Sequence, residues 1–209
     1  MRAEPDRPDK CCKIGWIGTG VMGKSMAGHL MSRGYTLLVH NRTASKADEL
    51  VANGAQFMSP VEIAQQADFL FLMLGYPHDV QSTVLDETNG ILQHMKAGAT
   101  LIDHTTSSPQ LAETIAEKAQ AKGVHSVDAP VSGGDIGARN GKLVIMVGGT
   151  EQGVNSVRSL LEIYAADVQH MGGPGAGQHT KMANQILIST TMVGLCESLL
   201  YAQKAGLNH

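Results

Sequence analysis

The sequence contains few aromatic residues, few cysteines and no long stretch of one charge. Aromatic side chains make up 4% of its 209 residues, and the three cysteines show none of the spacings that disulfide or zinc frameworks use. A net charge of −3 without a basic run gives no reason to expect a nucleic-acid partner. The longest uninterrupted apolar run, FLFLML at 69–74, is too short to cross a membrane. We therefore expect a cytosolic type of protein with reduced thiols and no metal site.

The N-terminal segment lacks the features of a targeting signal. It has no apolar stretch of the kind that a secretory signal needs. It also holds Glu4, Asp6 and Asp9, whereas mitochondrial leaders are poor in acidic residues. We therefore expect residues 1–12 to form a disordered arm and the protein to be cytoplasmic, with a mitochondrial location as the alternative.

What the sequence does contain is an alternation of short apolar runs and helical patterns. Hydrophobic residues make up 43% of the chain, enough for a substantial core. Such an alternation predicts βαβ units and therefore an α/β fold with a Rossmann-type, doubly wound, mostly parallel sheet over residues 13–173. The expected strands are 13–18, 36–40, 69–74, 100–105, 125–130 and 143–149, and the expected helices are 21–34, 44–54, 59–67, 108–123 and 151–164.

A glycine-rich stretch near residues 172–177 predicts a boundary, after which residues 174–209 form one long interdomain helix. The 28 residues from Gln178 to Ala205 would extend roughly 42 Å as a helix. Because it is apolar nearly all round, it should be covered by another chain or by a further C-terminal segment. We therefore expect it to be the start of an all-α domain that is truncated in this sequence. Its only full charges up to Ala205 are Lys181, Glu197 and Lys204.

The motif IGTGVMG places glycines at 18, 20 and 23 in the order G-x-G-x-x-G, directly after an expected strand and at the start of an expected helix. This context is typical of dinucleotide binding. Gly18 would allow the tight turn, Gly20 the approach of a pyrophosphate, and Gly23 close helix packing. The phosphates would then lie on the helix N-terminus, beside Val21 and Met22.

The end of the second expected strand indicates which dinucleotide is bound. An acidic residue there would bind the ribose 2′-hydroxyl. This sequence instead has Asn41, Arg42 and Thr43, and an arginine suits a 2′-phosphate. We therefore predict NADP as the cofactor, with NAD as the alternative. Arg42 could also be a solvated loop residue, and Lys46 could assist it or be an ordinary surface charge.

Three motifs in this order resemble a known family. GWIGTGVMGKSMAGHL at 15–30, DAPVSGG at 128–134 and GPGAGQHTKMANQ at 173–185 are similar to the signatures of the β-hydroxyacid dehydrogenase family. That family includes 3-hydroxyisobutyrate dehydrogenase, tartronate semialdehyde reductase and the glyoxylate/succinic semialdehyde reductases. Its members usually continue into an all-helical domain that closes the cleft and contacts the substrate.

The resemblance implies roles for individual residues. The matching positions assign the adenosine and ribose contacts to Met73 and Leu74, and a nicotinamide contact to Thr106. They assign the substrate carboxylate to Ser132, Gly133 and Gly134, and catalysis to Lys181. Many members carry an asparagine four residues after the lysine; here Asn184 lies three residues after it and Gln185 four, so Asn184 is the predicted substrate contact and Gln185 a second candidate.

The position of Lys181 also has a physical interpretation. The sequence predicts that it lies in the first turn of the long helix, where the helix dipole disfavours positive charge. Partial burial and the dipole would both lower its pKa, which suits a general acid and base for a hydroxyl proton. On spacing alone it could equally be a surface lysine that caps a loop carbonyl.

These observations predict an oxidoreductase that transfers a hydride between NAD(P) and a small 3-hydroxy acid or its semialdehyde. The partner would be a small carboxylate substrate, without nucleic acid or membrane, and the full-length protein would be a homo-oligomer. A glyoxylate/succinic or tartronate semialdehyde reductase is the alternative within the family. An inactive dinucleotide-binding or interaction module is the alternative of another class.

Overall fold

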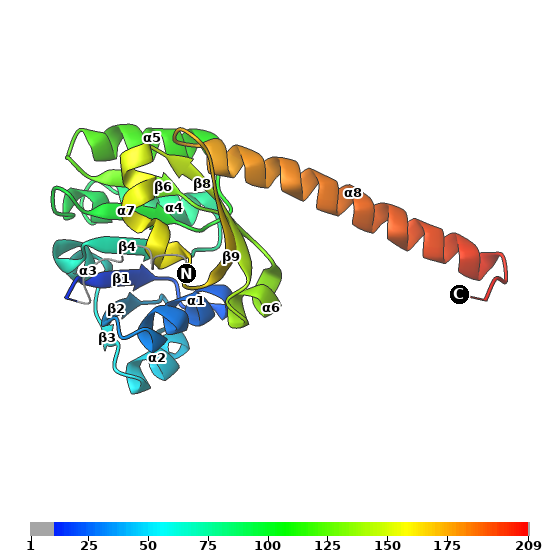
Figure 1. The fold of residues 1–209 in the computed structure, drawn as a ribbon, viewed down its shortest axis with the longest axis horizontal. Helices are drawn as coiled ribbons and strands as arrows, with labels where there is room; N and C mark the ends of the chain where they lie inside the picture. Colours follow the sequence, from blue (N-terminus) through cyan, green and yellow to red (C-terminus); the bar gives the residue numbers. More distant parts are fainter. Residues whose placement is uncertain (1–10, 209) are drawn as a thin grey trace, which may run out of the picture.

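The computed structural model describes residues 11–208 and shows an α/β domain from which one long helix, α8 (Ala176–Lys204), projects (Figure 1). The predicted Rossmann-type, mostly parallel sheet is confirmed. The expected arm at 1–12 lies almost entirely outside the described residues.

Within residues 11–208 the sheet has nine strands, in the order β3-β2-β1-β4-β5-β6-β8-β7, with β9 paired to β8. The strands from β3 to β6 run parallel, whereas β8 runs antiparallel to both β6 and β7. The chain runs outward from β1 in one direction and then returns to β4 on its other side. In doubly wound sheets the ligand crevice lies at such a switch point. The strands are β1 Ile14–Ile17, β2 Leu37–His40, β3 Gln56–Phe57, β4 Phe69–Leu72, β5 Thr100–Asp103, β6 His125–Asp128, β7 Val131–Ser132, β8 Leu143–Gly149 and β9 Ala165–Gly172.

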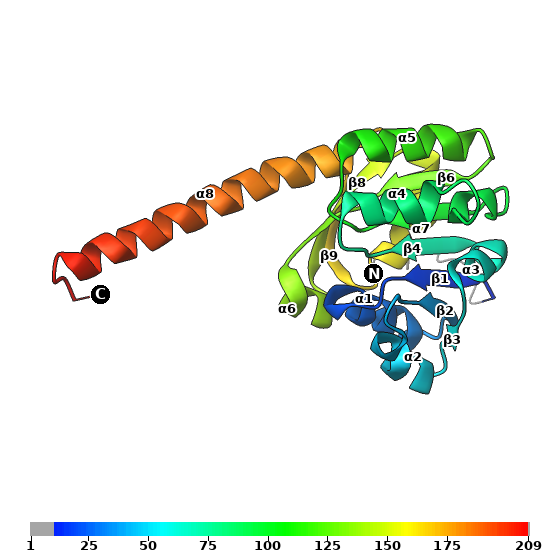
Figure 2. The same cartoon turned by 180° about the vertical axis from the view of Figure 1, so that it is seen from behind.

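Helices cover both faces of the sheet and enclose two hydrophobic cores (Figures 1 and 2). Apolar side chains of α1, α2, α6 and α7 pack on one face, and those of α3, α4 and α5 pack on the other. The helices are α1 Val21–Ser32, α2 Asp48–Ala52, α3 Pro60–Gln66, α4 Pro77–Leu85, α5 Pro109–Gln120, α6 Gly134–Arg139 and α7 Glu151–Leu161, with 3-10 turns η1 Ala44–Ala47 and η2 Ile91–Gln93.

Local capping explains why several helices begin where the sequence predicts. The Ser59 side chain accepts a hydrogen bond from the Glu62 amide, and the Glu62 carboxylate accepts from the Ser59 amide, directly before α3. At α5, Ser108 accepts from the Leu111 amide. Both α3 and α5 have a proline at their first position. Proline has no backbone N–H, and a helix needs none at this position.

The sequence did not predict α4, α6, β3, β7, β9 or the 3-10 turn η2. Among the described strands β9 pairs with β8 alone, and it is exposed at most of its positions, so it carries no continuous apolar run. The predicted helix at 44–54 is wrong in detail, because its first turn is the 3-10 helix η1.

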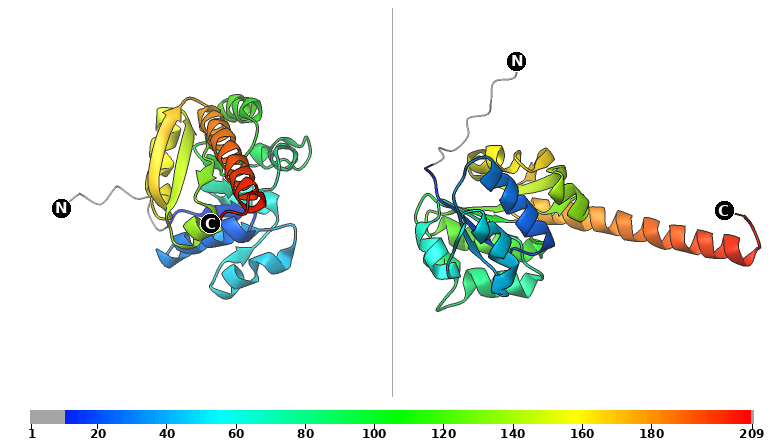
Figure 3. Two further views of the ribbon diagram at one scale, coloured as in Figure 1. Left: turned by 90° about the vertical axis from the view of Figure 1, so that its right-hand side faces the viewer. Right: turned by 90° about the horizontal axis from the view of Figure 1, so that it is seen from below.

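Within the described residues the long helix α8 packs on the sheet domain through its first turns, up to Asn184. Gly177, Gln178 and Lys181 are buried there, whereas residues 185–201 are exposed along the projecting part (Figure 3). By length and apolar composition α8 could cross a membrane, although a core helix of a larger protein has the same properties. The uncovered apolar side chains include Ile186, Leu187, Ile188, Met192, Val193, Leu195, Leu199 and Leu200.

Candidate active site

The glycine motif after β1 forms the turn that the sequence predicts. Gly18 has a φ of +100°, and a Cβ there would overlap the carbonyl of Met73 at the end of β4. A Cβ at Gly23 would overlap the Gly18 carbonyl. A Cβ at Gly20 would meet no atom within 4 Å, so this position is open. The three glycines therefore satisfy the geometry of a loop that admits a pyrophosphate.

The start of α1 has the polarity that a phosphate requires. Among the described residues, no side chain caps the N-terminus of α1, whose N-cap residue is Gly20. The first turn of this helix contains no acidic residue. Its backbone N–H groups are therefore left for an anion. The Thr19 hydroxyl is buried in the same loop, and no group in the part of the chain that the structure describes forms a hydrogen bond with it. Both features fit a dinucleotide pyrophosphate.

A cavity of about 750 Å³ lies at this loop. It is formed at the carboxyl ends of β1, β2 and β4, the location expected for a ligand in a doubly wound sheet. Thr106 does not line it; this residue is exposed on the loop that follows β5. The cavity lining includes all the other predicted cofactor residues: Gly18, Gly20, Val21, Met22, Gly23, Asn41, Arg42, Thr43, Met73 and Leu74.

Asn41 connects the glycine loop to the segment that follows β2. Its side-chain oxygen accepts a hydrogen bond from the Thr19 amide at 3.0 Å, and its amide group donates to the Thr43 carbonyl at 2.9 Å. The Asn41 side chain therefore connects two segments that form the wall of the cavity.

The Arg42 side chain is 93% exposed, and its nearest charged partner is Asp79, with 3.9 Å between Nη1 and Oδ1. Lys46 lines the same part of the cavity. Sequence reasoning missed the contribution of α4, which places Tyr76, His78 and Asp79 at this end of the cavity. Pro77 directly before a polar segment was the available signal for a helix start.

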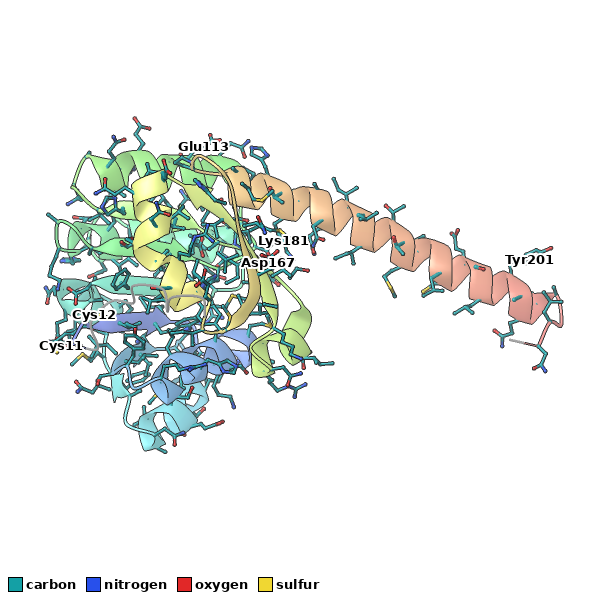
Figure 4. All side chains as sticks on the ribbon, in the orientation of Figure 1. Cys11, Cys12, Glu113, Asp167, Lys181 and Tyr201 are labelled. Atoms are coloured by element: carbon teal, nitrogen blue, oxygen red, sulfur yellow. The ribbon has the colours of Figure 1, made fainter. Side chains whose placement is uncertain are left out.

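Lys181 lies at the base of α8, on the side turned toward the sheet domain (Figure 4). It is 7% exposed, and within the described residues its ammonium group has neither a hydrogen bond nor an ion pair. Burial lowers the pKa of Lys181. The predicted first-turn position is wrong: α8 begins at Ala176, so Lys181 is in the second turn, where the dipole acts weakly. Desolvation is therefore the cause of the lowered pKa.

Asn184 and Gln185 differ in their surroundings. The Asn184 amide nitrogen is buried and has no hydrogen-bond partner among residues 11–208, whereas Gln185 is exposed. An unsatisfied buried donor one turn beyond Lys181 is costly unless a ligand or water completes it. This difference favours Asn184 over Gln185 as the residue that is predicted to contact the substrate.

The VSGG segment leads from β7 into α6. Gly133 and Gly134 have φ values of +127° and +62°, which side-chain-bearing residues rarely adopt. Both glycines are exposed, and Ser132 is half-buried beside them. The segment is joined to the lysine helix through β8, which pairs with β7 and packs against α8.

Two buried acids and one buried histidine lie at the carboxyl ends of β5 and β6. Asp103 and Asp128 are register partners on β5 and β6, and burial raises the pKa of Asp103 to about 7. Burial also raises the pKa of Asp128, whose oxygens accept the amides of Gly175 and Gln178. His104 lies fully in the core, and burial lowers its pKa to about 4.

Comparisons with known proteins follow the same division of the chain. Residues 13–173 match the model for the NAD-binding domain of 6-phosphogluconate dehydrogenase. Residues 175–209 match the model described as NAD-binding of NADP-dependent 3-hydroxyisobutyrate dehydrogenase.

The chain is also similar to individual proteins along almost all of its length. It is 52% identical to a probable 3-hydroxyisobutyrate dehydrogenase-like protein, mitochondrial, of Arabidopsis thaliana, covering 94% of this chain and 59% of that protein. The chain thus spans less than two thirds of that relative. The Mycobacterium tuberculosis 3-hydroxyisobutyrate dehydrogenase with L-serine has a TM-score of 0.86 at 30% identity, covering 94% of this chain and 67% of that one. Psf3 in complex with NADP+ and 2-OPP has a TM-score of 0.87 at 30% identity, covering 93% and 69%. With its nicotinamide-dinucleotide-binding domain, the chain belongs to the β-hydroxyacid dehydrogenase family.

Proposed function

We propose that this chain carries the dinucleotide site and the catalytic lysine of an enzyme that oxidises a small 3-hydroxy acid or reduces the corresponding semialdehyde. The observation that carries the proposal is Lys181: a buried lysine to which the described residues offer no anionic partner, on a helix that packs against β8, the strand with which β7 of the VSGG segment pairs. Residues 13–173 would form the dinucleotide-binding domain, and residues 174–209 the interdomain helix.

Lys181 would move the hydroxyl proton. The nicotinamide, when bound, supplies or takes the hydride. In oxidation the neutral Lys181 amine accepts the proton of the substrate hydroxyl, and in reduction its ammonium returns a proton to the carbonyl oxygen. Because burial lowers the pKa of Lys181, both protonation states are more accessible near neutral pH than for an exposed lysine.

The remaining site residues would hold and orient the substrate. Ser132 offers a hydroxyl, and Gly133 and Gly134 offer backbone N–H groups that no side chain obstructs, a combination suited to a carboxylate. Asn184 supplies the unsatisfied donor near Lys181. The names of the Arabidopsis and Mycobacterium relatives support a 3-hydroxyisobutyrate-like substrate, and a glyoxylate/succinic or tartronate semialdehyde fits the same groups.

NADP is the proposed cofactor. Arg42 and Lys46 provide two cations at the cavity end where a 2′-phosphate would lie, and Psf3 is a similar protein that binds NADP+. Asp79 lies within 3.9 Å of Arg42, which leaves NAD as the alternative.

Replacement of Lys181 by alanine tests the proposal. We expect kcat/KM for hydroxy-acid oxidation to fall by about 10²–10⁴-fold, the range that general acid–base catalysis contributes, while NADPH affinity by fluorescence changes less than about 3-fold. In the parent protein, kcat for oxidation should rise with pH through the lowered pKa of Lys181, and kcat for reduction should fall.

Lys122→Ala, at an exposed position outside both sites, is the matched control. Joint loss of NADPH binding and turnover in Lys181→Ala would mean that Lys181 is structural. Full retention of turnover would refute the proposal.

A further inference from the structure

Gln178 is the first polar side chain of α8 that is completely buried, with 0% of its surface exposed. Its amide is satisfied on both sides. Oε1 accepts a hydrogen bond from the Ser107 amide at 2.9 Å, and Nε2 donates to the Thr105 carbonyl at 2.7 Å. Gln178 therefore pairs with the loop after β5 as a peptide group would.

The two bonded residues flank Thr106. Thr105 and Ser107 are buried, whereas Thr106 between them is exposed. Gln178 fixes the carbonyl before Thr106 and the amide after it. It therefore determines how Thr106 is oriented at the surface of the domain. The cofactor contact that the sequence predicts after β5 is thus presented by a side chain from another element, 73 residues away from Thr105.

The same loop is also connected to the dinucleotide cavity. The Thr105 amide donates to Asp103 Oδ1 at 2.9 Å, and the Thr105 hydroxyl accepts the amide of Leu74, which lines the cavity, at 2.9 Å. Displacement of Thr105 would therefore disturb the cavity wall.

On the other side, Gln178 is tied to the lysine helix. Its own backbone amide donates to Asp128 Oδ2 at 2.9 Å, at the end of β6. A Cβ at the preceding Gly177 would overlap the Met146 carbonyl, so the helix start has no room to shift toward the sheet. Lys181 follows three residues later, on the same face of α8 as Gln178.

We propose that Gln178 is a positioning residue, which holds the Thr105–Ser107 loop and the base of α8 at a fixed separation and so sets Lys181 relative to the nicotinamide side of the cavity. The inference rests on the proposed function of Lys181. Small displacements of a reacting group cost large factors in rate, so this connection should matter for turnover more than for binding.

The test is Gln178→Met, which keeps the length of the side chain and removes both hydrogen bonds to the loop. Gln120→Met, at an exposed position of α5, is the matched control. We expect amide exchange at Ser107 to accelerate at least about 10-fold, and kcat to fall about 10–100-fold with substrate KM within about 3-fold. Loosening of the helix base would hydrate Lys181, so the pH at which it reacts with trinitrobenzenesulfonate, followed by mass spectrometry, should rise.

If Gln178→Met does not fold, Gln178→Leu replaces it, because it also removes both hydrogen bonds to the loop and is read by the same exchange at Ser107. Unchanged exchange at Ser107 would overturn the proposal. So would faster exchange with the reactivity of Lys181 and kcat equal to those of Gln120→Met, which would make Gln178 merely structural. Absence of turnover in the parent protein would count against the proposed function alone, and the exchange and the Lys181 modification profile would then decide the positioning.

Discussion

Asp128 accepts a hydrogen bond from the backbone N–H of Gln178 over 2.9 Å, although 50 residues separate the two in sequence. Its other carboxylate oxygen accepts the amide of Gly175 at 2.8 Å. The acid of DAPVSGG thus caps the helix of GPGAGQHTKMANQ, and one side chain joins the two motifs. The bond also satisfies N–H groups that the first turn of α8 would otherwise leave without partners.

Asp128→Ala should therefore destabilise the fold. It leaves the amides of Gly175 and Gln178 buried without acceptors, at about 1–3 kcal/mol each. We expect the free energy of unfolding in denaturant to fall by about 2–4 kcal/mol. Asp167→Ala, an exposed acid on β9, is the control and should change it by less than about 0.5 kcal/mol. Equal losses in the two variants would contradict the capping role.

A substitution in the glycine loop should weaken dinucleotide binding without changing the stability of the fold. Gly20→Ala adds a methyl group in open space, so the free energy of unfolding should stay within about 1 kcal/mol of the parent. The same methyl group lies where a pyrophosphate would approach, so NADPH affinity should fall at least about 10-fold. Calorimetric titration and denaturant unfolding measure the two quantities.

Gly23→Ala is the contrasting variant. Its Cβ would overlap the Gly18 carbonyl, so it should lose both stability and binding. If Gly20→Ala bound NADPH like the parent, the phosphate would not approach the loop there.

The sequence predicted the central strands because their side chains are buried on both faces and form continuous apolar runs, as in FLFLML of β4. It predicted the helix starts at α3 and α5 because serine and proline act locally. β9 carries no such signal: it is an edge strand defined by pairing with β8 rather than by its own composition.

The sequence could predict a part of the site only where consecutive residues of one short motif form that whole part. The glycine loop meets that condition, because its strand, turn and helix are consecutive. The hydrogen bonds of Gln178 do not, because its partners Thr105 and Ser107 lie in the loop after β5 and Asp128 lies at the end of β6. Partial burial of Lys181 was expected, but its extent could not be predicted, since it depends on where α8 begins and which strands it contacts.

Arg42→Asp tests the cofactor preference. A guanidinium paired with a 2′-phosphate contributes about 1.5–3 kcal/mol, so NADP affinity should fall about 10–100-fold. NAD has no phosphate there, and its affinity should stay constant or improve. Dissociation constants for both dinucleotides measure the ratio, with Lys122→Asp as a control of equal charge change on the exposed surface. An unchanged ratio would show that Arg42 does not select the cofactor.

Asp103 makes stability depend on pH in a predictable direction. Its pKa is about 7 in the folded protein against an ordinary value of 3.8, so the folded state binds more protons than the unfolded state between these values. The contribution of Asp103 to stability therefore falls as the pH rises from about 4 to about 7. His104, with a pKa of about 4 against 6.5, acts in the opposite direction over most of that window, because its folded form binds fewer protons.

Asp103→Asn removes the first effect and leaves the second. The variant should match the parent most closely near pH 4 and gain on it progressively up to pH 7, by at most about 4 kcal/mol for a shift of about three pKa units. Denaturant unfolding at pH 4.5, 6 and 8 measures the difference. Because Asn keeps an oxygen to accept the Thr105 amide, the comparison isolates ionisation from the loss of that bond. A difference in unfolding free energy that is independent of pH would mean that the pKa of Asp103 is not raised in the folded protein, and that its hydrogen bonds from Thr105 outweigh its burial.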